Sequence, residues 1–185
     1  MIREVLKMGD ARLLRVAAPV AAAQFDSEEL RALLQDMRDT MAHLNGAGLA
    51  APQIGVDLRV VIFGVHSNPR YPRAEDVPDT VLINPVITAL ASDTEEDWEG
   101  CLSVPGYRGS LTRSLSVTVK ALNEEGREIR LKSEDDLLAQ ALEHETDHVN
   151  GILYVDRLDA QTDLIKLELA PTSQGVGSRG RDEDE

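Results

Sequence analysis

The sequence has little cysteine, fewer basic than acidic residues and no long apolar segment. Its one cysteine, Cys101, cannot form an internal disulfide, which indicates a reducing compartment. Lysine and arginine total 19 against 33 aspartates and glutamates, for a formal net charge of -14. This balance argues against a DNA- or RNA-binding protein, because phosphate recognition needs clustered basic side chains.

No stretch reaches the roughly 18 consecutive apolar residues that a membrane helix needs. The best candidate, VLINPVITALA at 81–91, is short and is interrupted by Asn84 and Pro85. Residues 1–16 also lack the serine-rich, acid-poor composition of a transit peptide. We therefore expect a cytoplasmic protein that does not contact a membrane.

The composition is typical of a globular domain, with 42% hydrophobic and 28% charged residues in a chain of 185. We expect a single domain over residues 1–169. Residues 170–185, APTSQGVGSRGRDEDE, have no apolar periodicity and end in acids. They are predicted to form a disordered acidic tail.

Two helices are predicted near the ends of this domain. Residues 28–44 place leucine and methionine at helical spacing behind Ser27, which can cap the first turn. A second helix is expected to begin after a Ser133 cap, with Asp136 completing a capping box, and to continue through residue 149 to an Asn-Gly stop.

Strand-like segments lie between the two helices, at 59–65, 80–90, 114–122 and 127–131. Residues 66–79 contain three prolines and are predicted to form a surface loop. The strands are grouped and do not alternate with helices. The sequence therefore predicts an α+β fold, with mainly antiparallel sheets around the helix of the C-terminal half and an additional N-terminal helix.

The second predicted helix carries HETDH at 144–148. Because each helical residue turns by about 100°, His144 and His148 lie only about 40° apart and can bind one ion. Glu145 can take a proton from a water molecule at such a site and pass it on, which favours hydrolysis. The alternative is a pair of surface histidines, but these two emerge from the apolar stripe of the helix.

A metal site of this kind needs a third protein ligand. Peptidases with an H-E-x-x-H motif take that ligand from downstream, where this chain has no histidine. The downstream acids remain candidates: Asp156, Asp159, Asp163 and Glu168. Cys101 is the more distinctive candidate, because a thiolate with two imidazoles suits zinc or ferrous iron. Its alternative role is that of a small buried hydrophobic residue.

Three segments together resemble the peptide deformylases: GAGLAAPQIG at 46–55, EGCLS at 99–103 and HETDH at 144–148. Their order and spacing are similar to those of the family, and the resemblance covers nearly the whole chain. It implies a metallohydrolase that removes the formyl group from the N-terminal N-formylmethionine of newly made polypeptides and releases formate. The implied partners are N-formylmethionyl nascent peptides.

The resemblance also implies a metal centre with four functional side chains. Cys101, His144 and His148 would bind one divalent ion, and Glu145 would act as general base and then as general acid. The ion would be Fe2+ natively, although Zn2+, Ni2+ or Co2+ can occupy such a site in isolated protein.

Substrate recognition is implied at three further positions. The side-chain amide of Gln53 and the backbone N–H of Leu102 would stabilise the oxyanion. Gly48 has no side chain, so the narrow site would admit a formyl group there and exclude bulkier acyl groups.

The resemblance further implies that Asp147 pairs with Arg113 and anchors the ligand helix. The alternative is a solvated Asp147, because a helical projection places it on the polar side. Glu143 stands where the family usually has glutamine, and Asp136 where many members have glycine. Both project onto the polar face, so little effect on catalysis is expected.

The acidic end of the chain differs from the basic C-terminal helix of many bacterial members, which is associated with docking near the ribosomal exit tunnel. We therefore do not expect this chain to dock on the ribosome through its tail, although proximity to the ribosome remains open. A monomer is favoured.

Two other function classes remain open. A zinc peptidase would use a downstream acidic ligand, so that Cys101→Ser would retain metal. A metal-stabilised binding module would use Glu145 only structurally, so that Glu145→Gln would leave its function intact. His43 and His66 lack metal-ligand spacing and are interpreted as surface or loop residues. Trp98 can line the cleft or pack in the core.

Overall fold

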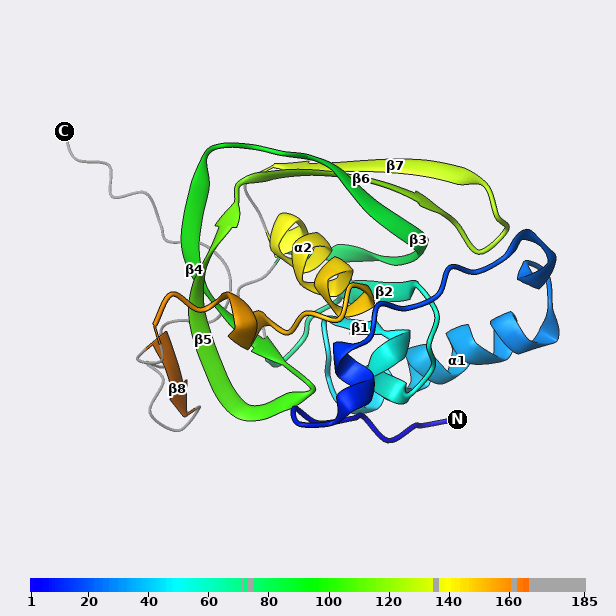
Figure 1. The fold of residues 1–185 in the computed structure, drawn as a ribbon, viewed down its shortest axis with the longest axis horizontal. Coiled ribbons are helices and arrows are strands. Elements are labelled where there is room, and N and C mark those ends of the chain that lie inside the picture. The colour runs from blue at the N-terminus through cyan, green and yellow to red at the C-terminus, as the bar shows by residue number, and fades with distance from the viewer. Residues whose placement is uncertain (71, 73–74, 135–136, 161–162, 167–185) are drawn as a thin grey trace.

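The computed structural model describes residues 1–70, 72, 75–134, 137–160 and 163–166. Within these residues, two antiparallel sheets and two α-helices form the molecule (Figure 1). The predicted α+β class with mainly antiparallel pairing is confirmed. The predicted tail at 170–185 lies outside the described residues. None of the described helices is both long enough and apolar enough to cross a membrane.

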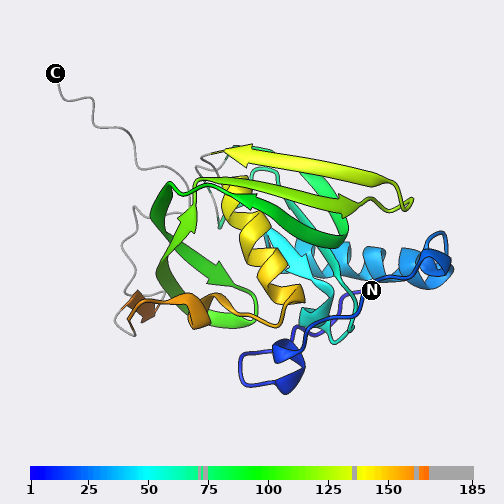
Figure 2. The same cartoon turned by 45° about the horizontal axis from the view of Figure 1, so that its top comes forward.

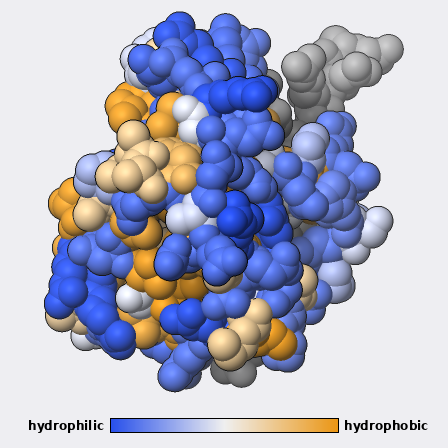
Figure 3. Space-filling model, turned by 90° about the vertical axis from the view of Figure 1, so that its right-hand side faces the viewer, coloured by the Kyte–Doolittle hydropathy of each residue, from blue (hydrophilic) through white to orange (hydrophobic). Residues whose placement is uncertain are grey.

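Helix α1, Glu28–His43, begins where the sequence predicts it. The Ser27 hydroxyl accepts a hydrogen bond from the Leu30 N–H at 3.1 Å, and two glutamates stand in the first turn, where they favour the helix dipole. The apolar side of α1 packs against one face of the larger sheet, with Leu33 and Met37 in the shared core. Hydrophilic side chains cover much of the side of the molecule shown in Figure 3, with smaller hydrophobic groups between them.

The larger sheet has the order β1-β2-β3-β6-β7. Its strands are β1 (Gly48–Ala50), β2 (Val60–Val65), β3 (Val77–Leu90), β6 (Ser116–Leu122) and β7 (Glu128–Glu134). Strand β2 is buried on both faces, because Ile62 belongs to the core beneath α1 and Phe63 to the core on the opposite side. Strand β1 forms one edge of this sheet.

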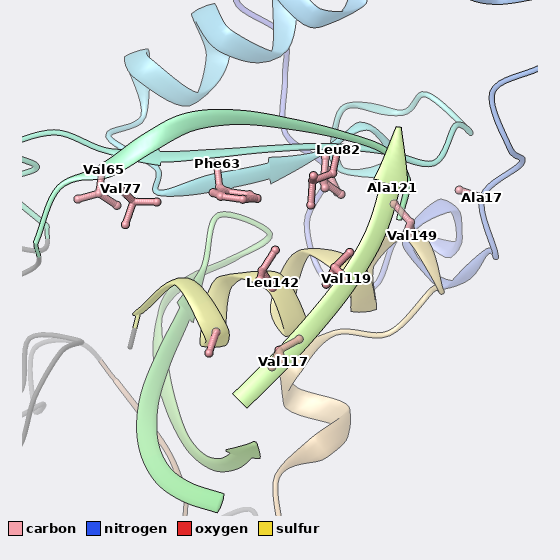
Figure 4. Close-up of a cluster of buried hydrophobic side chains, with 13 residues drawn as sticks. Ala17, Phe63, Val65, Val77, Leu82, Val117, Val119, Ala121, Leu142 and Val149 are labelled. Atoms are coloured by element: carbon pink, nitrogen blue, oxygen red, sulfur yellow. The ribbon is translucent and has the colours of Figure 1, made fainter. Parts of the chain in front are cut away.

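Helix α2, Leu137–Val149, lies between the two sheets and contacts strands of both (Figures 1 and 2). Its Leu142 and Val149 pack with Phe63 and Val119 in a hydrophobic core (Figure 4). The helix that carries HETDH is therefore central to the molecule, with protein on more than one side.

The smaller sheet has the order β4-β5-β8, with β4 (Thr94–Cys101), β5 (Val104–Ser114) and β8 (Leu164–Lys166). A tight turn joins β4 to β5 and pairs Cys101 with Val104. Cys101, Val104, Leu111 and Tyr154 form a third, smaller core. The short 3-10 helices are η1 (Ala11–Leu14), η2 (Ala22–Gln24), η3 (Ala51–Ile54) and η4 (Tyr154–Arg157).

One prediction about the elements was wrong, and one hairpin was not predicted. Ser133 does not cap the second helix, because it lies in β7 and pairs with Val117 of β6, and α2 is described from Leu137. Asp136, the other member of the predicted capping box, lies outside the described residues. The long β4–β5 hairpin was not predicted, since the acidic run TEEDWEG shows no apolar alternation.

Candidate metal centre

Cys101, His144 and His148 converge at the centre of the molecule. Cys101 ends β4, and the two histidines project from successive turns of α2. One donor atom from each residue lies within 4.8 Å of the other two, and Cys101 Sγ is 3.3 Å from His148 Nε2. Among the described residues no other group of His, Cys, Asp or Glu side chains meets in this way.

The orientation of His144 is fixed by Glu99. His144 Nδ1 lies 2.7 Å from Glu99 Oε1 within hydrogen-bond distance, so Nε2 is the nitrogen available to a metal. The ring of Tyr154 stacks on His144, with centroids 6.0 Å apart. The Nδ1 atom of His148, in contrast, is buried without a hydrogen-bond partner.

Arg113 connects β4, the strand that ends at Cys101, to α2. Its guanidinium donates from Nε and Nη2 to the Glu99 carboxylate at 2.7 and 2.9 Å, and from Nη1 to Asp147 Oδ2 at 2.8 Å. Arg157 donates to the same Asp147 carboxylate at 2.6 and 2.7 Å. Asp147 and Arg113, which the family resemblance pairs, are thus brought together.

No role was predicted from the sequence for Glu99, Arg157 or Tyr154. Glu99 lies inside the EGCLS segment, so its acidic side chain next to the glycine was a signal that could have been used. Tyr154 and Arg157 lie in η4, after α2. Their position beside the site depends on tertiary structure, which the local sequence does not show.

Charges around the centre favour a bound cation. Burial would raise the pKa of the Cys101 thiol, but the imidazoles of His148 and His144 outweigh burial and hold that pKa well below its usual range. Burial also opposes ionisation of Glu99, yet Arg113 and His144 lower the pKa of this carboxyl to about 2. A thiolate and two imidazole nitrogens suit zinc or ferrous iron, so the donor set fits a divalent ion.

A cleft opens at this centre, and Glu145 lines it together with Gln53, Cys101 and His144. Glu145 is buried, and burial raises the pKa of its carboxyl above the usual value. A Cβ added to Gly48 would overlap with the Glu145 carboxyl group. Because Gly48 has no side chain, it leaves room for Glu145, whereas the sequence predicted that this space admits the formyl group.

Gln53 and Leu102 flank the candidate metal ligands. The Gln53 amide nitrogen lies 3.5 Å from Cys101 Sγ, and Gln53 is 2% exposed. Leu102 follows Cys101 directly in the turn between β4 and β5, and both Gln53 and Leu102 line the cleft. Apolar groups of Leu102, Leu137 and Ala141 form part of its wall.

Helical projection misplaced two acidic residues. Glu143 and Asp147, expected on the polar face, are 7% and 5% exposed, because protein covers both sides of α2. Burial raises the pKa of Glu143 to about 7, and its Oε2 has no hydrogen-bond partner. Asp136, the other departure from the family pattern, lies outside the described residues.

The alternative ligands do not reach the centre within the described residues. Asp156 and Asp163 accept hydrogen bonds from the nearby backbone of Leu153 and Ala160, and Glu168 lies outside the described residues. His66 pairs with Asp79 at 3.1 Å on the surface.

His43 was interpreted from the sequence as a surface or loop residue, and Trp98 was left open between the cleft and the core. His43 ends α1, and Trp98 is half-buried in β4. Neither is among the residues that line the cleft.

Comparison with known proteins gives one consistent result. The family model described as Polypeptide deformylase matches residues 2–163. The chain is 57% identical to Peptide deformylase 1 of Nitrosomonas europaea over 159 residues, covering 86% of this chain and 89% of that protein. It is 49% identical to Peptide deformylase 2 of Pseudomonas putida over 158 residues, covering 85% and 88%.

Solved structures agree with this result. The Met-Ala-Ser-bound class I type b peptide deformylase of Acinetobacter baumannii is similar with a TM-score of 0.82 and 39% identity, covering 85% of this chain and 99% of that one. A peptide deformylase of Legionella pneumophila is similar with a TM-score of 0.77 and 41% identity, covering 88% and 89%.

Proposed function

The chain belongs to the peptide deformylase family and removes the formyl group from the N-formylmethionine of nascent polypeptides, and on this premise we propose how its residues divide the reaction. The observation that carries the proposal is the convergence of Cys101, His144 and His148 beside the buried carboxyl of Glu145. It brings a cation site and a proton acceptor into one cleft.

Cys101, His144 and His148 hold one divalent ion. The lowered pKa of the thiol and the contact of His144 with Glu99 supply the thiolate and the oriented imidazole that such binding requires. An ion held by these three side chains would act as a Lewis acid toward a water molecule and the formyl oxygen. We assign Fe2+ as the native ion, with Zn2+, Ni2+ or Co2+ able to occupy the site in isolated protein, since the same donors accept each of them.

Glu145 moves the proton. Its burial favours the neutral form, so the carboxylate readily accepts a proton from the attacking water. It then gives this proton to the amine of the departing methionine. Its place over Gly48 keeps the carboxyl inside the cleft, and a larger residue at position 48 would displace it.

Gln53 and Leu102 stabilise the charge that develops on the formyl oxygen. The amide of Gln53 and the backbone N–H of Leu102 are donors beside the metal ligands, and both are held by the fold before substrate arrives. The methionine side chain packs against the apolar wall formed by Leu102, Leu137 and Ala141.

Arg113 and Asp147 support the centre without taking part in the reaction. Arg113 joins Glu99 in β4 to Asp147 in α2 and so fixes the distance between the strand that bears Cys101 and the helix that bears both histidines. This support keeps the three ligands in register.

We further propose that the protein acts in the cytoplasm as a monomer, with residues 1–169 as the catalytic domain. Its substrates are N-formylmethionyl nascent peptides, and it does not dock on the ribosome through its tail. The single buried cysteine supports the reducing environment of the cytoplasm. The acidic sequence of residues 170–185 argues against docking through the tail.

The first experiment compares formyl-Met-Ala-Ser with acetyl-Met-Ala-Ser as substrates for metal-quantified protein, following formate and free amine. The expected result is cleavage of the formyl peptide alone, with kcat lowered by about 10²–10⁴-fold in Glu145→Gln while metal remains bound. Glu29→Gln, the same change on the exposed first turn of α1, is the matched control and should keep the parent kcat.

Cys101→Ser and Glu145→Gln together separate the rival functions. Cys101→Ser should lose metal, whereas a peptidase with a downstream acidic ligand would retain it. Full activity in metal-loaded Glu145→Gln would remove Glu145 from the reaction and leave the metal with a structural role only.

A further inference from the structure

Ser103 is buried beside the centre and has no part in the roles assigned above. It lies in the turn between β4 and β5, two residues after Cys101, and is 0% exposed. The Gln53 amide nitrogen donates to Ser103 Oγ at 3.1 Å. A buried hydroxyl is costly unless it is hydrogen-bonded, and here it serves as an acceptor for the amide that faces the metal ligands.

The direction of the Gln53 amide follows from its other contact. Gln53 Oε1 accepts a hydrogen bond from the Ala50 N–H at 2.9 Å. A backbone N–H can only donate, so the oxygen must occupy that side and the NH2 group must face the cleft. The NH2 group has two protons, and among the described residues it has two hydrogen-bond acceptors, Ser103 Oγ at 3.1 Å and Cys101 Sγ at 3.5 Å.

The backbones of Gln53 and Ser103 are also held by a common segment. The Leu6 N–H donates to the Gln53 carbonyl at 2.7 Å, and the Met8 N–H donates to the Ser103 carbonyl at 2.8 Å. The N-terminal segment thus fixes the turn that bears Ser103 relative to η3, which bears Gln53. The contact between the two side chains therefore belongs to a rigid arrangement.

We propose that Ser103 is a positioning residue that holds one N–H of Gln53 and thereby directs the other toward the formyl oxygen. The inference rests on the proposed oxyanion role of Gln53. A donor fixed before the reaction needs no reorientation as charge develops, and this is where electrostatic stabilisation is most effective. Without the hydroxyl, the amide could rotate about its last side-chain torsion and present its donors less often.

The test is a double-mutant cycle on metal-loaded enzyme with formyl-Met-Ala-Ser as substrate. The four proteins are the parent, Ser103→Ala, Gln53→Met and the double variant. Gln53→Met keeps the side-chain length and removes both amide donors. Metal content and Tm are measured for each protein, and Ser110→Ala serves as a matched change at another buried serine, one that donates to Glu96.

The expected pattern is a fall in kcat of about 10²–10³-fold for Gln53→Met and of about tenfold for Ser103→Ala, with KM unchanged. The double variant should be no slower than Gln53→Met, because Ser103 acts only through Gln53. Ser110→Ala should keep the parent kcat. Ser103→Cys, which keeps the size but is a weaker acceptor, supplies the same comparison if the alanine variant loses metal or Tm.

Two outcomes overturn the positioning role. One is a parent-like kcat in Ser103→Ala, and the other is an equal fall in kcat with and without the Gln53 amide, which indicates a structural effect. A parent-like kcat in Gln53→Met would instead remove the oxyanion role of Gln53 itself, and the Ser103 role with it, while leaving the metal and Glu145 assignments untouched.

Discussion

Helices α1 and α2 have similar lengths, 16 and 13 residues, but bury different kinds of side chain. The buried residues of α1 are Leu30, Leu33, Leu34, Met37 and Thr40. The buried residues of α2 include Glu143, Glu145, Thr146, Asp147 and His148. One helix buries an apolar stripe against a sheet, and the other places ionisable groups between two sheets.

Helix α1 therefore stabilises the fold, whereas α2 carries buried polar groups that the rest of the fold must support. Buried polar groups are costly when unpaired, and Glu145 Oε2, Thr146 Oγ1 and His148 Nδ1 have no partner. Asp147 is supported by Arg113 and Arg157. Local conflicts of this kind are expected where a sequence serves chemistry at some cost in stability.

The largest expected effect comes from removing the Arg113 ion pairs that support α2. Arg113→Ala leaves Glu99 and Asp147 buried without a shared cation, so we expect a loss of about 3–5 kcal/mol in the free energy of unfolding. Since Glu99 also orients His144, metal affinity should fall by about 10–100-fold. Denaturant titration and metal analysis measure the two effects.

The matched change on α1 is Arg38→Ala. Arg38 pairs with Glu124, but the two side chains are 43% and 41% exposed, so the loss should stay below about 1 kcal/mol with metal affinity unchanged. Equal losses from both variants would contradict the distinction between the helices. An Arg113→Ala protein with parent-like stability and metal content would exclude the anchoring role of Arg113.

The sequence predicted both helices and the histidine face of α2, but it did not predict that α2 is buried on its other side. The cap and apolar spacing of α1 predicted that helix, and HETDH placed two histidines on one face of α2. The projection of α2 failed for Glu143 and Asp147 because it assumes that a helix is buried on one side only. Burial on both sides depends on the second sheet, whose two long strands were not predicted.

Strands β4 and β5 were not predicted, for a related physical reason. In β4 the side chains of Glu95 and Glu96 are exposed, and the strand is held by its pairing with β5, so no apolar alternation marks it. Glu99 differs, since it is buried and paired with Arg113, a contact across 14 residues that no local periodicity records. The candidate metal ligands and the Arg113–Asp147 pair followed from short motifs and the family resemblance, whereas the contacts of Glu99, Arg157 and Tyr154 were not predicted.

A smaller effect is expected from Glu143→Gln, which restores the residue usual in the family. Burial raises the pKa of Glu143 from 4.5 to about 7, so as pH rises the unfolded chain ionises before the folded one. The contribution of neutral Glu143 to stability is therefore fully present below about pH 4.5 and is progressively lost as the pH rises to about 7. Glutamine does not titrate and should avoid this loss.

The measurement is Tm of parent and Glu143→Gln at constant metal content, at about pH 5 and about pH 8. The advantage of the glutamine variant should be larger at the higher pH. Glu128→Gln, an exposed change on β7, should show no such trend. An advantage that is equal at both values would mean that Glu143 is already ionised in the folded protein.

An effect on stability alone should come from the cap of α1. Ser27→Ala removes the acceptor of the Leu30 N–H and should cost about 1 kcal/mol in the free energy of unfolding, whereas Ser27→Asp, another good cap, should cost little. No residue of α1 lines the cleft, so kcat and metal content should stay at parent values in both variants. A fall in kcat per bound metal would show that α1 influences the centre through β1, and the division between a stabilising and a catalytic helix would then fail.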